Sequence, residues 1–373
     1  MSKEPKNLKR IRVEGFKSIK QLDSPMDDIN ILIGANGAGK TNLISLFTFL
    51  SRLSQGKLQQ YVKTEGGAEQ FFHFGTRNTE RIKLDMEIGN NGYRVEFLPN
   101  LDDDSLVFDV ESCRMIDSPG RSPWPLCSRK GESGLATEDL RGQPVEYYTK
   151  NYLDRCRVYH FHDTSSQAGL KKRSRLDNYY YLEEDAANIA PFLYDLKTSR
   201  DDKDQQSYNQ IVCAIQSVAP FFHDFYLEPT GKQGDENILL RWEHDGYELP
   251  FSANALSDGT ARFICLATLL LQPESRRPAT IILNEPELGL HPAALFVLAD
   301  IIRSISGKTQ VICSTQSVVF ANFFSPEDFI VTELKDGISV FRRIGRGQVE
   351  QWLGEYGMGD IWSKNLIGGR PEW

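Results

Sequence analysis

The chain has 373 residues, enough for one large hydrophobic core or two smaller ones. Its apolar and charged fractions, 40% and 25%, are those of an ordinary globular protein, and its formal net charge of −8 excludes a surface that is basic overall. Any contact with nucleic acid must therefore come from a local basic patch.

The cysteines and the apolar runs indicate a reduced, aqueous environment. The six cysteines are scattered and lack the close spacing of a metal site. Residues 1–10 contain no apolar core of a signal peptide, and no stretch reaches the ~20 apolar residues of a membrane span. Cys265 and Cys313 lie in apolar runs, so we expect them to be buried and reduced, in a cytoplasmic protein that does not contact a membrane.

The first hundred residues read mainly as strands. Residues 8–22 alternate as one strand, and residues 29–53 read as a strand, a glycine-rich loop and an apolar helix. Residues 82–99 predict a hairpin in which Asn91 and Gly92 supply the turn.

The middle of the chain changes character twice. Residues 113–146 are rich in Pro, Gly, Ser and charge, and predict an irregular surface segment. Helical periodicity then covers 186–198 and 204–218, and 238–251 predict a second hairpin. No heptad pattern is sustained, so we expect no long coiled coil.

From residue 252 onward helices and strands alternate. A helix is followed by a strand over 279–283, a second helix, a strand over 309–314 and a hairpin over 328–344. This alternation favours an α/β fold with a parallel sheet. The tail, 346–373, mixes glycines with aromatic residues, and we expect it to pack back onto the body.

The segment "GANGAGKT", residues 34–41, fits the phosphate-binding pattern G-x-x-x-x-G-K-[ST] between a strand and a helix. Backbone N–H groups in such a loop and the helix N-terminus bind phosphate oxygens. Lys40 is expected to reach the β- and γ-phosphates of ATP, and the Thr41 hydroxyl to ligate Mg²⁺. The predicted contacts are Gly34, Asn36, Gly37, Gly39, Lys40, Thr41 and Asn42.

A second glycine-containing turn opens the helix of "ALSDGTARF", residues 255–263. Taken alone, Ser257 is a helix N-cap. The same helix N-terminus can bind an anion, and Gly259 would let that anion approach closely. Because a phosphate loop precedes this turn and an acidic strand end follows it, we predict that Ser257 and Gly259 contact the nucleotide.

Three motifs, "GANGAGKT", "LSDG" at 256–259 and "LNEPELGLHP" at 283–292, resemble those of ABC-type ATPases of the RecF/SMC/OLD group. The chain more specifically resembles the compact predicted AAA-family ATPases of bacterial anti-phage defence loci. "IRVEGFKSI", "YHFHDTSS", "STQS" and the Gly-rich end also fit, so the resemblance spans nearly the whole chain.

The resemblance implies a two-lobed α/β ABC-type ATPase, a P-loop NTPase with antiparallel strands in lobe I and a short helical insertion instead of a long coiled coil. The resemblance implies one domain, 1–373. Its Walker A lobe covers 1–165 and a helical insertion covers 166–225. The signature, Walker B and switch segments lie in 226–345, and the tail follows at 346–373. Two ATP molecules would be sandwiched in a head-to-tail homodimer, with Ser257 of one subunit touching the γ-phosphate held by the other.

The resemblance also assigns roles at the strand end. Glu285 would polarise the attacking water, and Asn284 stands where the family carries an aspartate that supports Mg²⁺. An amide oxygen can accept a hydrogen bond from a Mg²⁺-bound water but lacks the charge that holds the ion. We therefore expect weaker Mg²⁺ binding and slow hydrolysis; the alternative is a protein that binds ATP without hydrolysing it.

Further polar residues lie in or near these motifs. Gln316 replaces the family's switch histidine, so its role would be positional, and Gln167 is a loosely aligned candidate to sense Mg²⁺ or the attacking water. His291 precedes a proline and reads as structural. His160 and His162 share a strand face but lack further metal ligands at recognisable spacing.

The resemblance implies a switch that closes on ATP, opens after hydrolysis and controls a separately encoded effector, expected to be a Toprim-like nuclease, in anti-phage defence. Two alternatives stay open: a RecF-like DNA-repair ATPase, and a nucleotide-gated scaffold with little hydrolysis. The basic run 171–175, followed by three tyrosines at 179–181, could contact nucleic acid or form a solvated face.

Overall fold

A mostly parallel six-stranded sheet forms the centre of the molecule, with strand order β18-β17-β3-β16-β15-β8. The computed structural model describes residues 7–117, 123–127, 130–136, 140 and 144–370. The strands are β3 (Ile29–Gly34), β8 (Cys156–Tyr159), β15 (Thr280–Asn284), β16 (Gln310–Ser314), β17 (Phe329–Lys335) and β18 (Ile338–Arg343). All neighbours pair in parallel except β17 and β18, so the carboxyl ends of five strands meet at one edge.

The central sheet separates two hydrophobic cores. In β3, Leu32 packs into the first core, whereas Ile31 and Ile33 pack into the second. The side chains of β15 alternate in the same way: Ile282 packs into the first core and Ile281 into the second. Continuous apolar strands are typical of a parallel sheet that is covered on both faces.

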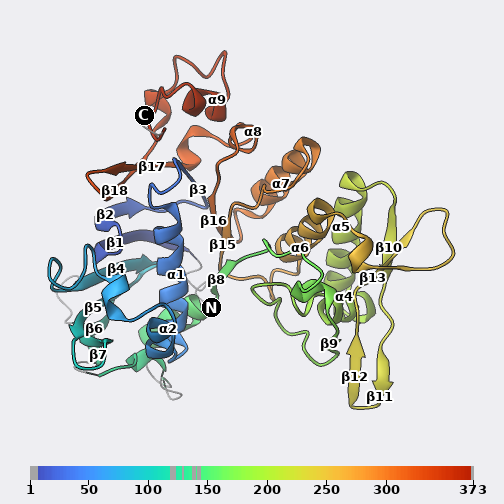
Figure 1. Cartoon of the computed structure of the whole chain (residues 1–373), viewed down its shortest axis with the longest axis horizontal. Coiled ribbons are helices and arrows are strands. Elements are labelled where there is room, and N and C mark those ends of the chain that lie inside the picture. Colours follow the sequence, from blue (N-terminus) through green and yellow to red (C-terminus); the bar gives the residue numbers. More distant parts are fainter. Residues whose placement is uncertain (1–6, 118–122, 128–129, 137–139, 141–143, 371–373) are drawn as a thin grey trace.

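The first core lies against a six-stranded antiparallel sheet, β2-β1-β4-β5-β6-β7, and three helices (Figure 1). Its strands are β1 (Leu8–Phe16), β2 (Ile19–Pro25), β4 (Ile82–Ile88), β5 (Asn91–Asn100), β6 (Ser105–Met115) and β7 (Trp124–Cys127). The helices are α1 (Lys40–Ser54), α2 (Leu58–Thr64) and α3 (Pro144–Asp154). This is the antiparallel lobe I that the resemblance to ABC-type ATPases implied.

Two local predictions in this lobe were wrong. Residues 8–22 do not form one strand: Lys17 adopts a φ of +48°, and β1 turns back into β2 as a hairpin. The turn between β4 and β5 lies at Gly89, whose φ is +57°, and Asn90. Asn91 and Gly92 already belong to β5 and pair with β4. The sequence offers four adjacent turn residues, and only the pairing register selects among them.

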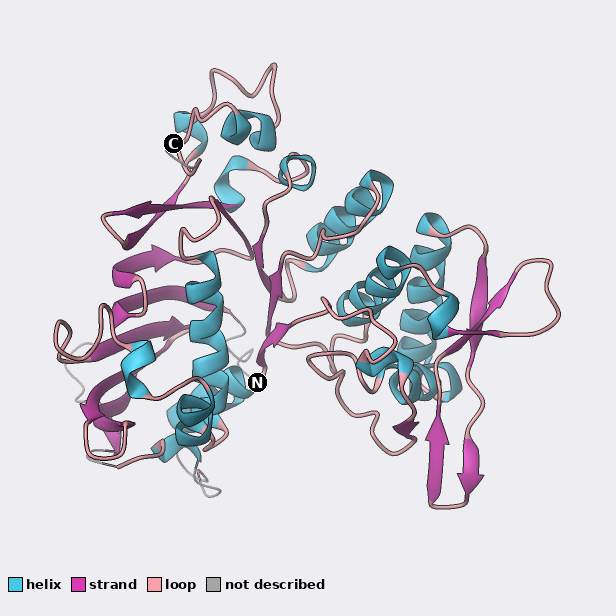
Figure 2. Ribbon diagram, in the orientation of Figure 1, coloured by secondary structure: helices cyan, strands magenta, loops and turns pink. Residues whose placement is uncertain are grey.

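The second core contains helices α4 (Ile189–Thr198), α5 (Asp202–Val218), α6 (Asp258–Leu271) and α7 (Pro292–Ile305). The helices predicted around 186–198 and 204–218 are present. Two small sheets lie beyond them, β10-β13-β14 and β11-β12-β9 (Figure 2). Their strands are β9 (Ser174–Arg175), β10 (Phe222–Tyr226), β11 (Thr230–Lys232), β12 (Asp235–Ile238), β13 (Arg241–His244) and β14 (Phe251–Ser252).

The helices are short. The longest in the described part of the chain, α5, has 17 residues, so no long coiled coil is present there. No helix among the described residues is both long and apolar enough to cross a membrane. The single-turn 3-10 helices are η1 (Ala68–Phe71), η2 (Gly134–Ala136), η3 (Gly169–Lys171), η4 (Ala253–Ala255), η5 (Pro326–Asp328) and η6 (Arg346–Gln348).

The C-terminal segment packs on the body through α8 (Val318–Ala321) and α9 (Met358–Ser363). Ile361 and Trp362 are buried in the second core. Asn322 donates a 3.0 Å hydrogen bond to Asp360, and the Gly369 amide donates to Glu333 at 2.9 Å. These contacts attach the tail to the end of the central sheet.

Candidate nucleotide-binding site

The glycine-rich loop joins β3 to α1 at the carboxyl edge of the central sheet. Lys40 is the first residue of α1, and its Nζ donates to the carbonyl oxygens of Gly34 (2.6 Å) and Ala35 (3.0 Å). Burial lowers the pKa of Lys40, and the charges of Glu285 and Glu287 oppose that shift. The ammonium group therefore lies inside the loop and within electrostatic reach of the acidic strand end.

Gly39 shows why this loop needs glycine. Its φ is +109°, and a Cβ there would lie 2.0 Å from the Ser339 Oγ. The Ser339 and Ser18 hydroxyls are 2.6 Å apart, and Asn42 donates to Ser18 at 2.6 Å. A polar chain thus anchors the start of α1 to two hairpins, and it already engages the Asn42 amide that the sequence assigned to ATP.

The remaining loop residues present polar groups outward. Asn36, Gly37 and Thr41 are exposed in the loop and the first turn of α1. Backbone N–H groups at a helix N-terminus favour a phosphate, and an exposed Thr41 hydroxyl can reach a cation bound beside it. These three residues are therefore open to a phosphate and its cation, and their contacts stay a prediction.

Asn284 ends strand β15 and Glu285 follows it, at the same carboxyl edge of the central sheet as the glycine-rich loop. The Asn284 Oδ1 accepts a hydrogen bond from Ser314 Oγ at 2.7 Å. Glu285 follows Asn284 and has a backbone φ of +47°. Its backbone N–H donates to the Ser314 carbonyl oxygen at 3.0 Å, and this hydrogen bond restrains the backbone conformation. Left-handed conformations at non-glycine residues persist where the surroundings impose them and concentrate at functional sites.

Gln316 and Glu285 lie together although their strands are separate in sequence. Gln316 follows β16, and its Nε2 donates to the Glu285 Oε1. The structure thus brings three of the predicted residues, Lys40, Glu285 and Gln316, to one edge of the sheet. The side-chain amide of Gln316 can orient the Glu285 carboxylate, but it cannot accept and transfer a proton as a histidine could.

Glu287 is a site residue that the sequence assignment omitted. It is 8% exposed, and its Oε1 accepts from the Thr315 hydroxyl (2.6 Å) and the Gln316 amide N–H (2.9 Å). Among the described residues its buried Oε2 has no hydrogen-bond partner. Glu287 therefore ties the end of β15 to the segment that carries Gln316. Its acidic type, two residues after Glu285, was the only signal in the sequence.

Burial raises the pKa of Glu287 above its usual value of 4.5, although hydrogen bonds from Thr315 and Gln316 oppose the shift. The folded chain therefore holds this proton at pH values where the unfolded chain has lost it, so stability falls as pH rises from 4.5 to the folded pKa. Glu287→Gln removes this dependence. The difference in free energy of unfolding, Glu287→Gln minus wild type, should therefore rise as pH increases from 4.5 to the folded pKa of Glu287. Above that pH the difference should stay constant.

Denaturant unfolding at several pH values measures this difference, with the exposed Glu355→Gln as the matched control. A difference between Glu287→Gln and wild type that does not change with pH would contradict the assignment. Glu287→Ala leaves two donors without their acceptor and should lower the free energy of unfolding by about 1–3 kcal/mol at all pH values.

The signature turn lies at the N-terminus of α6. Ser257 is exposed and caps the helix by accepting from the Thr260 amide at 3.1 Å. A Cβ at Gly259 would lie 2.4 Å from the Gly289 carbonyl oxygen, so this glycine is needed for packing against the loop after β15. Helices α6 and α1 contribute to different cores, on opposite faces of the central sheet.

Arg262 is a second residue that the sequence did not single out. It is 8% exposed on α6, and it donates to the carbonyl oxygens of Phe161 (2.8 Å) and His162 (3.1 Å). The signature helix is thereby fixed to the loop that leaves β8. Only the fold brings these segments, about a hundred residues apart, into contact.

Other predicted residues are not joined to this group. Gln167 is exposed in the loop after β8, and in the described part of the chain no hydrogen bond links its side chain to Thr41 or Asn284. His291 caps α7 by accepting from the Ala293 amide at 3.3 Å. No cluster of three His, Cys, Asp or Glu residues suited to a metal ion occurs among the described residues.

The basic run at 171–175 is partly neutralised. Arg175 forms a two-bond ion pair with Asp177, at 3.0 and 2.8 Å, and Lys171 donates to the Thr164 carbonyl at 2.6 Å. Tyr179 and Tyr180 stack on each other with ring centroids 4.6 Å apart. Much of this segment is thus engaged in local structure.

A phosphate loop between β3 and α1, acidic groups after β15, a switch segment after β16 and a capped signature helix define a nucleotide-binding protein of the ABC ATPase class. The family model described as "AAA domain, putative AbiEii toxin, Type IV TA system" matches residues 29–123 and 129–322. The chain belongs to this family.

Two kinds of relative agree with this assignment. The DNA replication and repair protein RecF of Renibacterium salmoninarum is 35% identical over 89 residues, which are 22% of this chain. The chain spans about a fifth, 21%, of the length of that relative.

Among solved structures, an Smc head bound to the C-terminal winged-helix domain of ScpA aligns with a TM-score of 0.55 at 16% identity, covering 92% of this chain and 99% of that one. The Smc head with an extended coiled coil, bound to the C-terminal domain of ScpA derived from Pyrococcus furiosus, gives 0.54 at 16% identity, covering 93% and 98%. The chain therefore has the fold of an SMC-type ATPase head.

Proposed function

We propose that the chain is an ATP-binding and ATP-hydrolysing dimeric switch that controls an effector partner in bacterial anti-phage defence. The observation that carries the proposal is the placement of Glu285, restrained by Gln316, beside the loop that contains Lys40. A base, a phosphate-binding cation and a switch residue at one edge are the parts that nucleotide hydrolysis requires.

The residues present suit ATP and Mg²⁺. Lys40 and the backbone N–H groups of the loop would hold the phosphates, and the Thr41 hydroxyl and the Asn284 amide oxygen would face the ion or its waters. When bound, Mg²⁺ neutralises charge on the phosphate oxygens. Ser314 donates to the Asn284 oxygen and so fixes the amide at the sheet edge.

In the proposed reaction Glu285 accepts a proton from the attacking water. Gln316 orients the carboxylate, and Glu287 holds Gln316 in place through its amide N–H. Lys40 stabilises the charge that develops on the phosphate oxygens. Ser257 of the second subunit would complete the site, which makes hydrolysis depend on the dimer.

The defence role rests on the family and on the resemblance of the chain to ATPases of defence loci. The family description names a toxin of a type IV toxin–antitoxin system, and the structural neighbours were determined with ScpA bound to the Smc head. In our proposal the ATPase acts in the cytoplasm and controls a separately encoded effector, a Toprim-like nuclease. An ATP-dependent affinity for duplex DNA ends without such an effector would instead favour a repair ATPase.

Phosphate release during a Mg²⁺ titration tests the hydrolysis and the role of Asn284 together. Wild type should release phosphate from ATP, and Asn284→Asp should need a lower Mg²⁺ concentration for half-maximal rate, because the added charge holds the ion more tightly. At saturating Mg²⁺ the two rates should converge.

Identical titration curves would remove residue 284 from the metal site. A higher rate of Asn284→Asp at saturating Mg²⁺ would show that the asparagine slows the chemical step instead. If wild type binds ATP but releases no phosphate, the proposed hydrolysis is wrong. The remaining reading is then a nucleotide-gated scaffold.

A further inference from the structure

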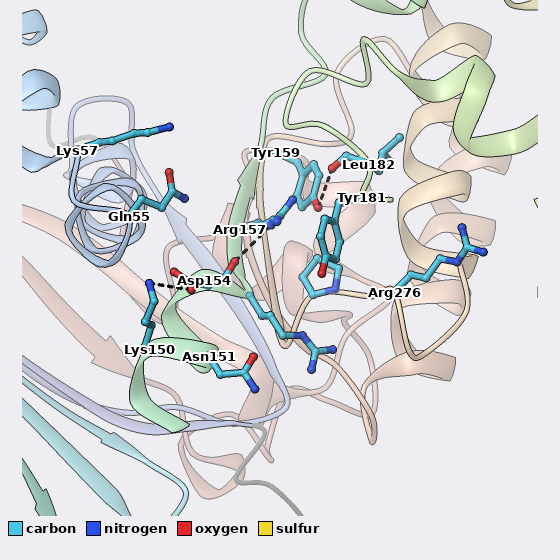
Figure 3. A pocket seen from close by; sticks show the side chains of 12 residues that line it. Gln55, Lys57, Lys150, Asn151, Asp154, Arg157, Tyr159, Tyr181, Leu182 and Arg276 are labelled. Carbon is cyan, nitrogen blue, oxygen red and sulfur yellow. Dashed lines mark hydrogen bonds and ion pairs between the residues drawn. The ribbon is translucent and has the colours of Figure 1, made fainter. Parts of the chain in front are cut away.

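A polar cavity of about 570 Å³, which no residue of the glycine-rich loop lines, lies elsewhere in the molecule (Figure 3). Its lining includes five cations and a single acid: Lys57, Lys150, Arg155, Arg157, Arg276 and Asp154. Arg155 and Pro278 precede β8 and β15, so the cavity adjoins the amino-terminal ends of these strands, opposite the edge that carries Glu285. Its volume falls within the roughly 300–1,000 Å³ of small-molecule sites.

Two of the cations are already neutralised. Lys150 pairs with Asp154 at 3.2 Å and donates to the Ser54 carbonyl at 2.9 Å. Arg276 pairs with Asp195 and Asp204 at 2.5 and 2.6 Å. These pairs leave the single acid of the lining occupied.

The other three cations have no acidic partner among the residues that the structure describes. Arg155 donates to the Arg277 carbonyl at 2.7 Å, and Arg157 contacts the Asp154 carbonyl at 3.4 Å. No ion pair to Lys57, Arg155 or Arg157 occurs in the described part of the chain. Three positive side chains that line one cavity, whose single acid is already paired with Lys150, favour an anion. Guanidinium groups bind phosphate through two parallel hydrogen bonds.

An aromatic side chain stands next to this charge. The Arg157 guanidinium lies 4.8 Å from the ring centroid of Tyr181, and Tyr181 is 56% exposed. Figure 3 shows Lys57 entering from one side of the cavity and Tyr181 from the other, with Arg157 between them. A planar base can stack on such a ring while its phosphate meets the cations.

We propose that this cavity binds a small phosphorylated molecule of mononucleotide size. Lys57, Arg155 and Arg157 would bind the phosphate, and Tyr181 would stack on the ring. A nucleic-acid strand needs cations along an open track. Here the three cations face one cavity between the two lobes, and residues 171–175 do not line it.

The position of this phosphate site links it to both lobes. Lys57 lies between α1, which begins at the glycine-rich loop, and α2. Arg157 belongs to β8, and Tyr181 precedes α4 in the second lobe. A bound ligand would therefore bridge the two lobes. The binding itself does not depend on hydrolysis at Glu285.

Calorimetric titration of Lys40→Ala tests the inference, because this variant removes the phosphate lysine of the first site. AMP should bind, and adenosine, which lacks the phosphate, should bind at least tenfold more weakly. Adding Lys57→Gln and Arg157→Gln should weaken AMP binding at least tenfold. The control pair Lys172→Gln and Arg173→Gln, both exposed outside the cavity, should leave it unchanged.

Thermal melting checks that the variants fold, and the exposed Lys57→Gln alone should still weaken AMP binding if the double substitution unfolds the chain. No binding of AMP, or equal binding after both cavity substitutions, would overturn the inference. A 5′-phosphorylated oligonucleotide that binds more tightly than AMP and depends on the same two residues would also overturn it, by assigning the cavity to nucleic acid.

Discussion

Glu285→Gln is expected to reduce ATP turnover by at least about 100-fold while ATP binding is retained. Glutamine keeps the shape of the side chain but cannot accept the proton of the attacking water, and such groups contribute roughly 10²–10⁴-fold to rate. Steady-state phosphate release and nucleotide binding, measured on the same preparation, separate the two effects.

The matched control for this substitution is Glu350→Gln, which removes the same charge from an exposed position in the tail. It should turn over ATP like wild type. An unchanged rate in Glu285→Gln would remove this residue from the mechanism, and the contact with Gln316 would then be structural.

Lys40→Ala is expected to weaken ATP binding at least tenfold, which corresponds to about 1.4 kcal/mol. Lys40 is 5% exposed and its ammonium group lies inside the loop, where the motif predicts contact with the β- and γ-phosphates of ATP. Fluorescence titration with a labelled ATP analogue measures the change.

Lys63→Ala, at an exposed position in α2, is the control for charge alone and should bind ATP like wild type. If Lys40→Ala binds as tightly as wild type, the loop is not the phosphate site. In that case the pKa shift of Lys40 would reflect only its burial among loop carbonyl groups.

The elements that build the site were predictable because their signals are local. The glycine-rich loop fits a pattern eight residues long, and the strands that end at Asn284 and Ser314 are continuous apolar runs. The parallel pairing of those strands follows from their alternation with helices. The resemblance to ABC-type ATPases supplied the further expectation that Lys40, Glu285 and Gln316 belong to one site.

The parts that were missed depend on contacts between distant segments. Gly39 is confined by Ser339, three hundred residues away, and Arg262 binds the carbonyl groups of a loop a hundred residues earlier. The Glu287 carboxylate accepts a hydrogen bond from Thr315, which follows the neighbouring strand β16. No spacing rule in one sequence reveals such pairs, because they arise only when segments that are distant in the chain pack together.

The N-terminal hairpin illustrates the same limit at short range. The apolar alternation of β1 continues into β2, so the periodicity alone reads as one strand. The reversal occurs at Lys17, a residue type that rarely takes a positive φ. Its backbone N–H donates to the Phe71 carbonyl at 2.8 Å, so the turn is held by a segment that local analysis does not include.

The central claim is that ATP closes two chains into a dimer through Ser257, and light scattering of Glu285→Gln tests it most directly. Without nucleotide the mass should be the 42.4 kDa of one chain, and with Mg²⁺-ATP it should double. Adding Ser257→Arg, which places a cation where the γ-phosphate of the other subunit should dock, should keep the mass at 42.4 kDa although ATP stays bound. A Glu285→Gln chain that carries ATP and remains at 42.4 kDa would contradict the dimeric switch.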